Sequence, residues 1–219
     1  MSTIISTKPR TARLHTRAAA RRQASSVLAT LRSLAPQRPL RWHELERIAE
    51  LQANRLLELA RISAPAVQIE VISGLPRIEV RQVVDLPVGG SADWVGGRWI
   101  VSVAGGDSPA RQRYSIAHEF KHIVDHPVRQ VIFAGATDSA SEAQAERIAE
   151  YFAACLLMPK RLVVRLWGQG VQRLSELSER FEVSPRAMQI RLWQLGLVDP
   201  APRCPSARAF LTPVRGPLT

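Results

Sequence analysis

The most constraining feature of the sequence is the segment His118-Glu-Phe-Lys-His122, in which two histidines stand four residues apart. A helix advances about 100° per residue, so these imidazoles lie one turn apart on one face and can reach a single metal ion. Glu119 lies beside them, where a carboxylate can accept a proton from water held by that ion. The segment therefore predicts a zinc-dependent hydrolase rather than a surface helix with two incidental histidines.

The helix that carries this segment is expected to be buried. Ser108 is a suitable N-cap and Pro109 a suitable first residue, so we expect the helix to begin there. Apolar residues surround the two histidines: Tyr114, Ile116, Ala117, Phe120, Ile123 and Val124. A charged Glu119 in such surroundings is costly unless an ion or a hydrogen bond accompanies it, which favours a metal site.

The positive charge of the chain is concentrated at its two ends. The 219 residues have a formal net charge of +11, yet residues 1–42 contain nine Lys or Arg and no acidic residue. Residues 201–219 contain three Arg and no acidic residue, so the segment between these ends has a net charge close to zero. The net positive charge of the chain is therefore no indication that its body binds nucleic acid.

The basic N-terminal segment is compatible with several roles. Its arginines can bind nucleic-acid phosphates weakly and without sequence specificity: Arg10, Arg13, Arg17, Arg21 and Arg22. A solvated and largely flexible extension explains the same composition, and so does an organelle transit peptide. Helical spacing also gives an apolar stripe that can dock on the body, formed by Val27, Leu28, Leu31 and Leu34.

The remaining composition predicts a soluble protein with reduced thiols. Cys155 and Cys204 show no metal-ligand spacing, and Cys155 lies in an apolar run typical of a buried small residue. The sequence contains no apolar stretch near 20 residues and no secretory signal. We therefore expect a cytoplasmic location and no contact with a membrane.

The pattern before the metal-binding helix predicts an α+β fold. An amphipathic helix is expected over residues 43–60, followed by strands over 67–72, 78–84 and 98–103. The last of these follows a tight turn at Gly96-Gly97. Residues 99–103 are a candidate edge strand that could hold an extended substrate through its backbone, although they also suit an ordinary core strand.

A catalytic zinc ion usually has three protein ligands, so a third ligand is needed elsewhere. A second long helix is expected over residues 141–158, ending before Pro159, with Glu142, Glu146 and Glu150 every four residues. Glu142 suits a solvated acidic face, whereas Glu146 or Glu150 would lie in a more enclosed part of that helix. His126, one turn after His122, points about 80° away from His118 and suits a supporting or surface position better.

These residues resemble the ImmA/IrrE family of metallopeptidases. The resemblance lies in Arg113-Tyr-Ser-Ile-Ala-His-Glu-Phe-Lys-His122, followed by Glu146 and then by Phe152-Ala-Ala-Cys-Leu-Leu-Met-Pro159. It implies a zincin-like fold in which His118, His122 and Glu146 bind zinc and Glu119 is the general base. It also implies, as for several members, cleavage of a partner transcriptional repressor, often one encoded beside the protease.

Two residues depart from the family pattern. Lys121 stands where the family commonly has Gly, which adds a cation near the site that is tolerated if its stem points outward. Glu150 stands where Asn is common, within one turn of Glu146. Glu150 is therefore the alternative metal ligand.

Residues 171–195 are expected to form two helices joined by a short turn, with Ser184 as the N-cap of the second helix and Gly196 closing it. Such a pair resembles a helix-turn-helix, in which Arg186 and Gln189 could contact bases. Packing of the pair on the peptidase core is the favoured interpretation, because acidic residues on its first helix would oppose phosphates.

The sequence thus predicts four segments: a basic, largely flexible extension (1–42), a zincin-like metallopeptidase core with a short mixed sheet (43–168), the helical pair (169–199) and a disordered tail (200–219). The leading hypothesis is a zinc metalloendopeptidase, with Tyr151, His126 or Arg113 as the donor that supports the transition state. The alternative is a non-proteolytic regulator that binds DNA or protein and uses zinc structurally.

Overall fold

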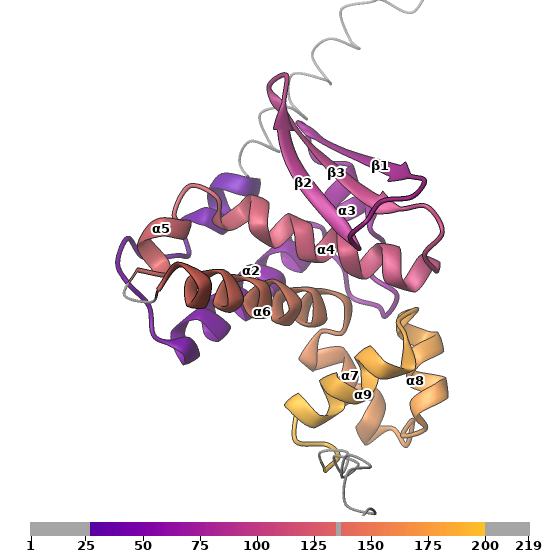
Figure 1. Ribbon diagram of the computed structural model, residues 1–219. Helices are drawn as coiled ribbons and strands as arrows, with labels where there is room; N and C mark the ends of the chain where they lie inside the picture. The colour runs from indigo at the N-terminus through magenta and orange to yellow at the C-terminus, as the bar shows by residue number, and fades with distance from the viewer. Residues whose placement is uncertain (1–26, 135–136, 200–219) are drawn as a thin grey trace, which may run out of the picture.

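The computed structural model describes residues 27–134 and 137–199, in which a small sheet packs against a set of helices (Figure 1). The strands are β1 (Ile78–Val83), β2 (Gly90–Val95) and β3 (Arg98–Ala104). The helices are α2 (Trp42–Leu59), α3 (Glu70–Ser73), α4 (Pro109–Asp125), α5 (Arg129–Ile132), α6 (Asp138–Leu157), α7 (Lys160–Gly168), α8 (Leu174–Phe181) and α9 (Pro185–Gln194). This mixed arrangement confirms the predicted α+β class.

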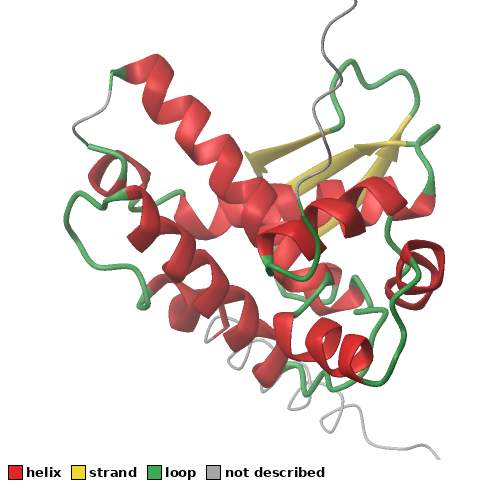
Figure 2. Ribbon diagram, turned by 90° about the horizontal axis from the view of Figure 1, so that it is seen from below, coloured by secondary structure: helices red, strands yellow, loops and turns green. Residues whose placement is uncertain are grey.

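The sheet has the order β1-β3-β2, with β1 parallel and β2 antiparallel to β3. Figure 2 shows the helices gathered on one side of it. Gly96 and Gly97 both adopt positive φ angles, 57° and 80°, which a tight hairpin between β2 and β3 requires. The prediction that residues 99–103 form an edge strand is wrong, because β3 lies between the other two strands. The edge beside α4 is β2, which was not predicted from the sequence.

The predicted strand over residues 67–72 is also wrong, since its second half is the short helix α3. Val67 and Ile72 are both buried. They are five residues apart, so a strand would have placed them on opposite faces, whereas a turn followed by a helix buries both. Burial in the fold has here overridden the β propensity of the segment.

The core lies where α4 packs against α6, and α2 packs against α6 as well (Figure 1). The rings of Phe120 and Phe152 are 6.2 Å apart at this contact, and both side chains are fully buried. The helix predicted over residues 43–60 is confirmed as α2, and α4 begins after Ser108, whose side chain accepts a hydrogen bond from the Arg111 backbone. In the described part of the chain, no helix is both long enough and apolar enough to span a membrane.

Residues 27–42 pack on this core instead of forming part of a flexible extension. Residues 27–32 are helical, and Leu31 of the predicted apolar stripe is fully buried. The Gln52 side chain donates to the Leu31 carbonyl, and Arg32 donates to the carbonyls of Ile123 and Val124 near the end of α4. The basic residues expected to bind phosphates, Arg10 to Arg22, lie outside the described residues, as do Cys204 and the tail 200–219.

The predicted helical pair is present as α8 and α9. Glu182 joins the two helices in a left-handed conformation, and the Ser184 side chain accepts a hydrogen bond from the Ala187 backbone. The pair packs on the body through Arg191, which is buried and donates to the Met158 carbonyl at the end of α6. This arrangement agrees with the favoured interpretation that the pair packs on the core.

Lys121 does not point outward, so it is tolerated for another reason. Its side chain is only 3 % exposed, and its ammonium group donates to the carboxylate of Asp125 at 2.6 Å and to the Gln52 side chain at 2.8 Å. Burial lowers the pKa of Lys121, while Asp125 opposes that change. Lys121, which stands where glycine is common in the family, is therefore held by a buried ion pair within α4 and by a hydrogen bond to α2.

We predict that Asp125→Asn destabilises the protein by about 3–5 kcal/mol, because it removes one partner of a buried ion pair. Chemical denaturation of the full chain would measure this change in the free energy of unfolding. Asp107→Asn is the matched control, since Asp107 and Arg111 form a largely exposed pair whose loss should cost no more than about 1 kcal/mol. Equal losses for the two variants would contradict the prediction.

Candidate metal centre and cleft

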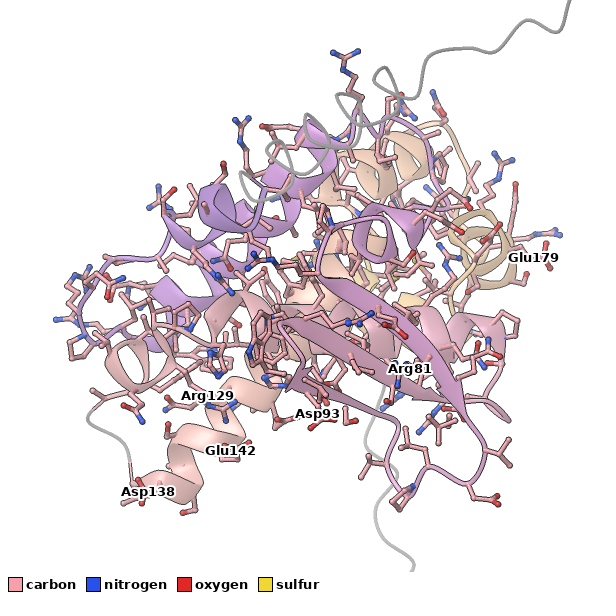
Figure 3. The ribbon with its side chains drawn as sticks, turned by 90° about the horizontal axis from the view of Figure 1, so that it is seen from above. Arg81, Asp93, Arg129, Asp138, Glu142 and Glu179 are labelled. Atoms are coloured by element: carbon pink, nitrogen blue, oxygen red, sulfur yellow. The ribbon has the colours of Figure 1, made fainter. Side chains whose placement is uncertain are left out.

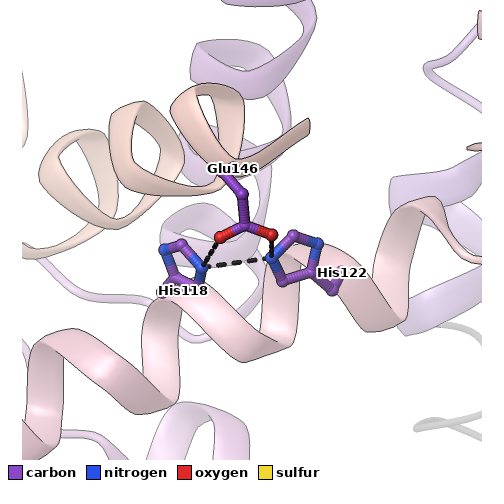
Figure 4. Close-up of side chains that lie close together, drawn as sticks. All are labelled: His118, His122 and Glu146. Carbon is purple, nitrogen blue, oxygen red and sulfur yellow. Dashed lines mark hydrogen bonds and ion pairs between the residues drawn. The ribbon is translucent and has the colours of Figure 1, made fainter. Parts of the chain in front are cut away.

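Two neighbouring helices bring the three predicted ligands together (Figure 4). His118 and His122 project from the same face of α4, and Glu146 projects toward them from α6. The two Nε2 atoms are 3.1 Å apart, and the Glu146 carboxylate lies 3.1 Å from His118 Nε2 and 3.2 Å from His122 Nε2. The ligand atoms of two α4 residues and of one α6 residue thus converge, all lying within 4.8 Å of one another.

These separations fit a metal ion. Zinc binds His nitrogen and carboxylate oxygen at about 2.0–2.2 Å in tetrahedral geometry, which places neighbouring donor atoms about 3.3 Å apart. The separation of the two Nε2 atoms, 3.1 Å, is within about 0.2 Å of that value, and the Glu146 carboxylate faces one nitrogen with each oxygen, Oε2 toward His118 and Oε1 toward His122. Two imidazoles and one carboxylate also form a donor set typical of catalytic zinc sites, which leave the fourth position to water.

The electrostatic surroundings favour the form of histidine that binds metals. Burial and the neighbouring His118 lower the pKa of His122, although Glu146 acts in the opposite direction. The His122 ring is therefore expected to be neutral near pH 7, with a lone pair available to an ion. Its side chain is 18 % exposed and that of Glu146 is 48 % exposed, so the cluster is reached from solvent on the carboxylate side.

Glu119 lies in a different environment from Glu146. Burial raises the pKa of Glu119 to about 7, and the negative charges of Glu146 and Asp93 act in the same direction. Asp93 belongs to β2, next to this site (Figure 3). A carboxyl group with a pKa near 7 is suited to both accepting and donating a proton at neutral pH.

Gly90 is a site residue that was not predicted from the sequence. A Cβ atom at this position would lie 3.1 Å from both Cγ and Oε1 of Glu119 and 3.4 Å from the Ser102 carbonyl oxygen. The absence of a side chain therefore lets the edge strand β2 approach Glu119 closely. In the sequence Gly89-Gly90 indicates a turn, yet a glycine at a strand end is also a signal of close backbone approach.

The group formed by His118, His122 and Glu146, which we call the metal cluster, opens into a cleft of about 1580 Å³. The cleft is lined by the start of β2, by α4 and α6, by the beginning of α2 and, at some distance along the chain, by α9. His118, Glu119, His122 and Glu146 all contribute to its surface. The catalytic candidates therefore lie within a single open space large enough for several residues of a polypeptide.

The remaining candidates are distributed differently. Tyr151 lines the cleft, and its pKa is raised to about 12 by burial, so its hydroxyl is protonated and can donate. His126 is exposed, and its ring packs against Trp99 at 5.0 Å. Arg113 donates to the Glu182 carboxylate and to the Val67 carbonyl, which ties α4 to α8 and to the segment before α3.

Glu150, the alternative ligand, is outside the group of donor atoms formed by His118, His122 and Glu146. It lies one turn further along α6 and lines the cleft. Its backbone carbonyl accepts a hydrogen bond from the Tyr114 hydroxyl at 2.9 Å. In this arrangement Glu150 belongs to the cleft wall rather than to the cluster.

The raised pKa of Glu119 leads to a prediction for the metal-free protein. The folded pKa is above the unfolded value, so ionising the carboxyl group destabilises the fold as pH rises from about 4.5 to above 7. We expect metal-free Glu119→Gln to melt at a higher temperature than the parent protein at pH 8. The difference should vanish near pH 4, where the parent carboxyl is protonated in both states. Equal melting temperatures at pH 8, measured with a chelator present, would contradict this.

Comparison with known proteins agrees with the geometry. The chain has the fold of a Mycobacterium tuberculosis transcriptional regulator, with 22 % sequence identity, a TM-score of 0.55 and coverage of 69 % of this chain. The match spans 46 % of that regulator's length. No curated protein matched the chain. Residues 82–192, half of the sequence, match the peptidase family described as the IrrE N-terminal-like domain. The chain therefore belongs to this family of IrrE-like metallopeptidases.

Proposed function

We propose that this protein is a zinc-dependent endopeptidase that cleaves a transcriptional repressor. The observation that carries the proposal is the convergence of His118, His122 and Glu146 at separations that suit one tetrahedral ion, with Glu119 beside them in the same cleft. Membership of a metallopeptidase family supports the class of reaction. The repressor as substrate is supported by the resemblance to ImmA/IrrE proteins.

The chemistry divides between the ion and the chain. Zinc held by this cluster would lower the pKa of water toward about 7 and polarise the carbonyl of the scissile bond. Glu119 accepts the proton of the attacking water and later delivers it to the nitrogen of the departing amine. Its pKa of about 7 before an ion binds reflects how strongly its surroundings favour proton uptake. The Tyr151 hydroxyl, which lines the cleft, is our candidate donor to the developing oxyanion.

The edge strand β2 gives the substrate a place to bind. Its first residues, Gly90, Ser91 and Ala92, line the cleft beside Glu119. An extended polypeptide can add to the open edge of β2 through backbone hydrogen bonds, which do not depend on side-chain identity. We therefore assign to β2 the binding of an extended substrate that the sequence suggested for residues 99–103, because β3 is paired on both edges.

We predict that Glu119→Gln retains zinc but lowers the rate of cleavage by about 10²-fold or more, since the general base is lost. The assay incubates the purified chain with small DNA-binding proteins encoded beside it and follows cleavage by mass spectrometry. His118→Ala is the companion variant and should lose both zinc and activity, as metal analysis would show. Undiminished cleavage by Glu119→Gln would remove Glu119 from the role of base. A zinc-containing parent protein that cleaves none of the candidates would favour the non-proteolytic regulator.

We also predict that Gly90→Ala lowers kcat several-fold while zinc content stays unchanged. The new methyl group would displace Glu119 by a few tenths of an ångström, and catalysis is sensitive to such shifts. Gly106→Ala is the matched control, because a Cβ atom added to Gly106 would have no neighbouring atom within 4 Å and the backbone angle there is ordinary. An unchanged kcat for Gly90→Ala would show that the close approach of β2 is not required.

A further inference from the structure

The helix α9 forms a wall of the cleft that the proposed chemistry does not use. Arg186, Ile190 and Trp193 all line the cleft and stand at positions i, i+4 and i+7, which share one face of a helix. The opposite face of α9 is buried through Met188 and Leu192. One face of this helix therefore holds it in the core while the other faces the space that contains the metal cluster.

The cleft face of α9 is unusually apolar for a solvent-exposed helix surface. Trp193 is 51 % exposed and Ile190 is 37 % exposed, which places both among the exposed large hydrophobic residues of the described chain. Large apolar side chains that line an open cleft are typical of binding surfaces. The apolar part of α9 thus suits a large apolar side chain of a bound polypeptide.

The first turn of α9 adds positive charge to this apolar surface. Arg186 is exposed there, and the helix has no acidic residue in its first turn. The other arginines that line the cleft are already engaged: Arg111 with Asp107, Arg129 with Glu142 (Figure 3), and Arg147 over the ring of Trp42. Arg186 and the positive end of the helix dipole therefore favour an acidic group at this point.

We infer that Arg186, Ile190 and Trp193 form a specificity surface, which selects substrate segments that carry an acidic side chain and a large apolar side chain. Arg186 and Trp193 are separated by about 10 Å along the helix axis. An extended chain spans that distance with about three residues. The expected segment therefore has the acidic and apolar residues about three positions apart. The inference rests on the proposed function in placing a polypeptide in the cleft.

Nucleic acid is another ligand whose negative charge Arg186 could contact. The structure favours a polypeptide instead. Ile190 and Trp193 occupy the remainder of the same helix face, where phosphate recognition would need cations or hydrogen-bond donors. The preceding helix α8 carries Glu176 and Glu179, the latter visible at the surface in Figure 3. Glu176 is paired with Arg180, so Glu179 is the acidic group of this helix that would repel a phosphate backbone lying across the helical pair.

A binding experiment tests the inference without requiring cleavage. The full chain carrying Glu119→Gln is titrated into fluorescein-labelled Ala/Ser peptides that contain Glu and Phe, Lys and Phe, or Glu and Ser about three residues apart. We expect the Glu/Phe peptide to bind about fivefold more tightly than the Lys/Phe peptide. Arg186→Glu should reverse that order, and Trp193→Ala should remove the advantage of Phe over Ser. Fluorescence anisotropy measures each affinity.

Matched variants show whether the effects belong to this surface. Arg165→Glu makes the same change in net charge at an exposed position of α7, and Leu51→Ala truncates an apolar side chain of α2 that is 46 % exposed. Neither residue lines the cleft, so both should leave the peptide order unchanged. Equal affinities for all peptides, no binding of any, or equal effects of the control variants would overturn the inference.

Two further outcomes separate the inference from the proposed function. Peptide selection without cleavage of any protein would support the specificity surface while the peptidase proposal fails. Cleavage of a repressor that is unaffected by Arg186→Glu and Trp193→Ala would sustain the peptidase and overturn the surface. Binding of a random-sequence DNA duplex that Arg186→Glu abolishes would assign the residue to nucleic acid and overturn the inference as well.

Discussion

The packing of α4 against α6 is the contact on which the rest of the structure depends. Phe120 and Phe152 are fully buried at this contact, and each lies close in sequence to a residue of the metal cluster. Because the two helices are held by core side chains, His118 and Glu146 meet without help from a flexible loop. Precise placement matters for such a site, since metal ligands must sit within a few tenths of an ångström of their required positions. The hydrophobic core thus sets the geometry of the chemistry.

The same helix is anchored a second time by charged and polar groups. Lys121, between the two histidines in sequence, pairs with Asp125 and with Gln52 of α2, and Gln52 also donates to the Leu31 carbonyl. A buried cation is costly unless such partners accompany it, so Lys121 is accommodated by Asp125 and by Gln52, whose amide is held by the Leu31 carbonyl. The N-terminal segment therefore takes part in positioning the site, although its sequence suggested a mostly solvated extension.

The elements with a strong internal signal were predictable from the sequence. Periodicity and capping residues located α2, α4, α6 and the helical pair, and Gly96-Gly97 indicated the tight turn before β3. The errors arose in segments whose secondary structure is determined by tertiary contacts. Residues 67–72 have β propensity but bury Val67 and Ile72 together, and β2 has little apolar alternation because an edge strand buries little surface. The spacing of His118 and His122 indicated a shared ligand site, whereas the proximity of Gly90 to Glu119 depends on a strand pairing that no local pattern encodes.

The position of α9 indicates a role for the helical pair that its sequence pattern did not predict. Two helices joined at Glu182 resemble a DNA-reading unit, but a recognition helix needs its exposed face directed away from the body. Here Arg191 fixes α9 against the end of α6, and the face that remains exposed lines the cleft that contains the metal cluster. Residues that follow His118 and His122 by about 70 positions are thereby brought to the same cleft. The side chains of α4 and α6 and those of α9 occupy different walls of one cleft. Substitutions in α9 can therefore change substrate selectivity without moving the proposed metal ligands.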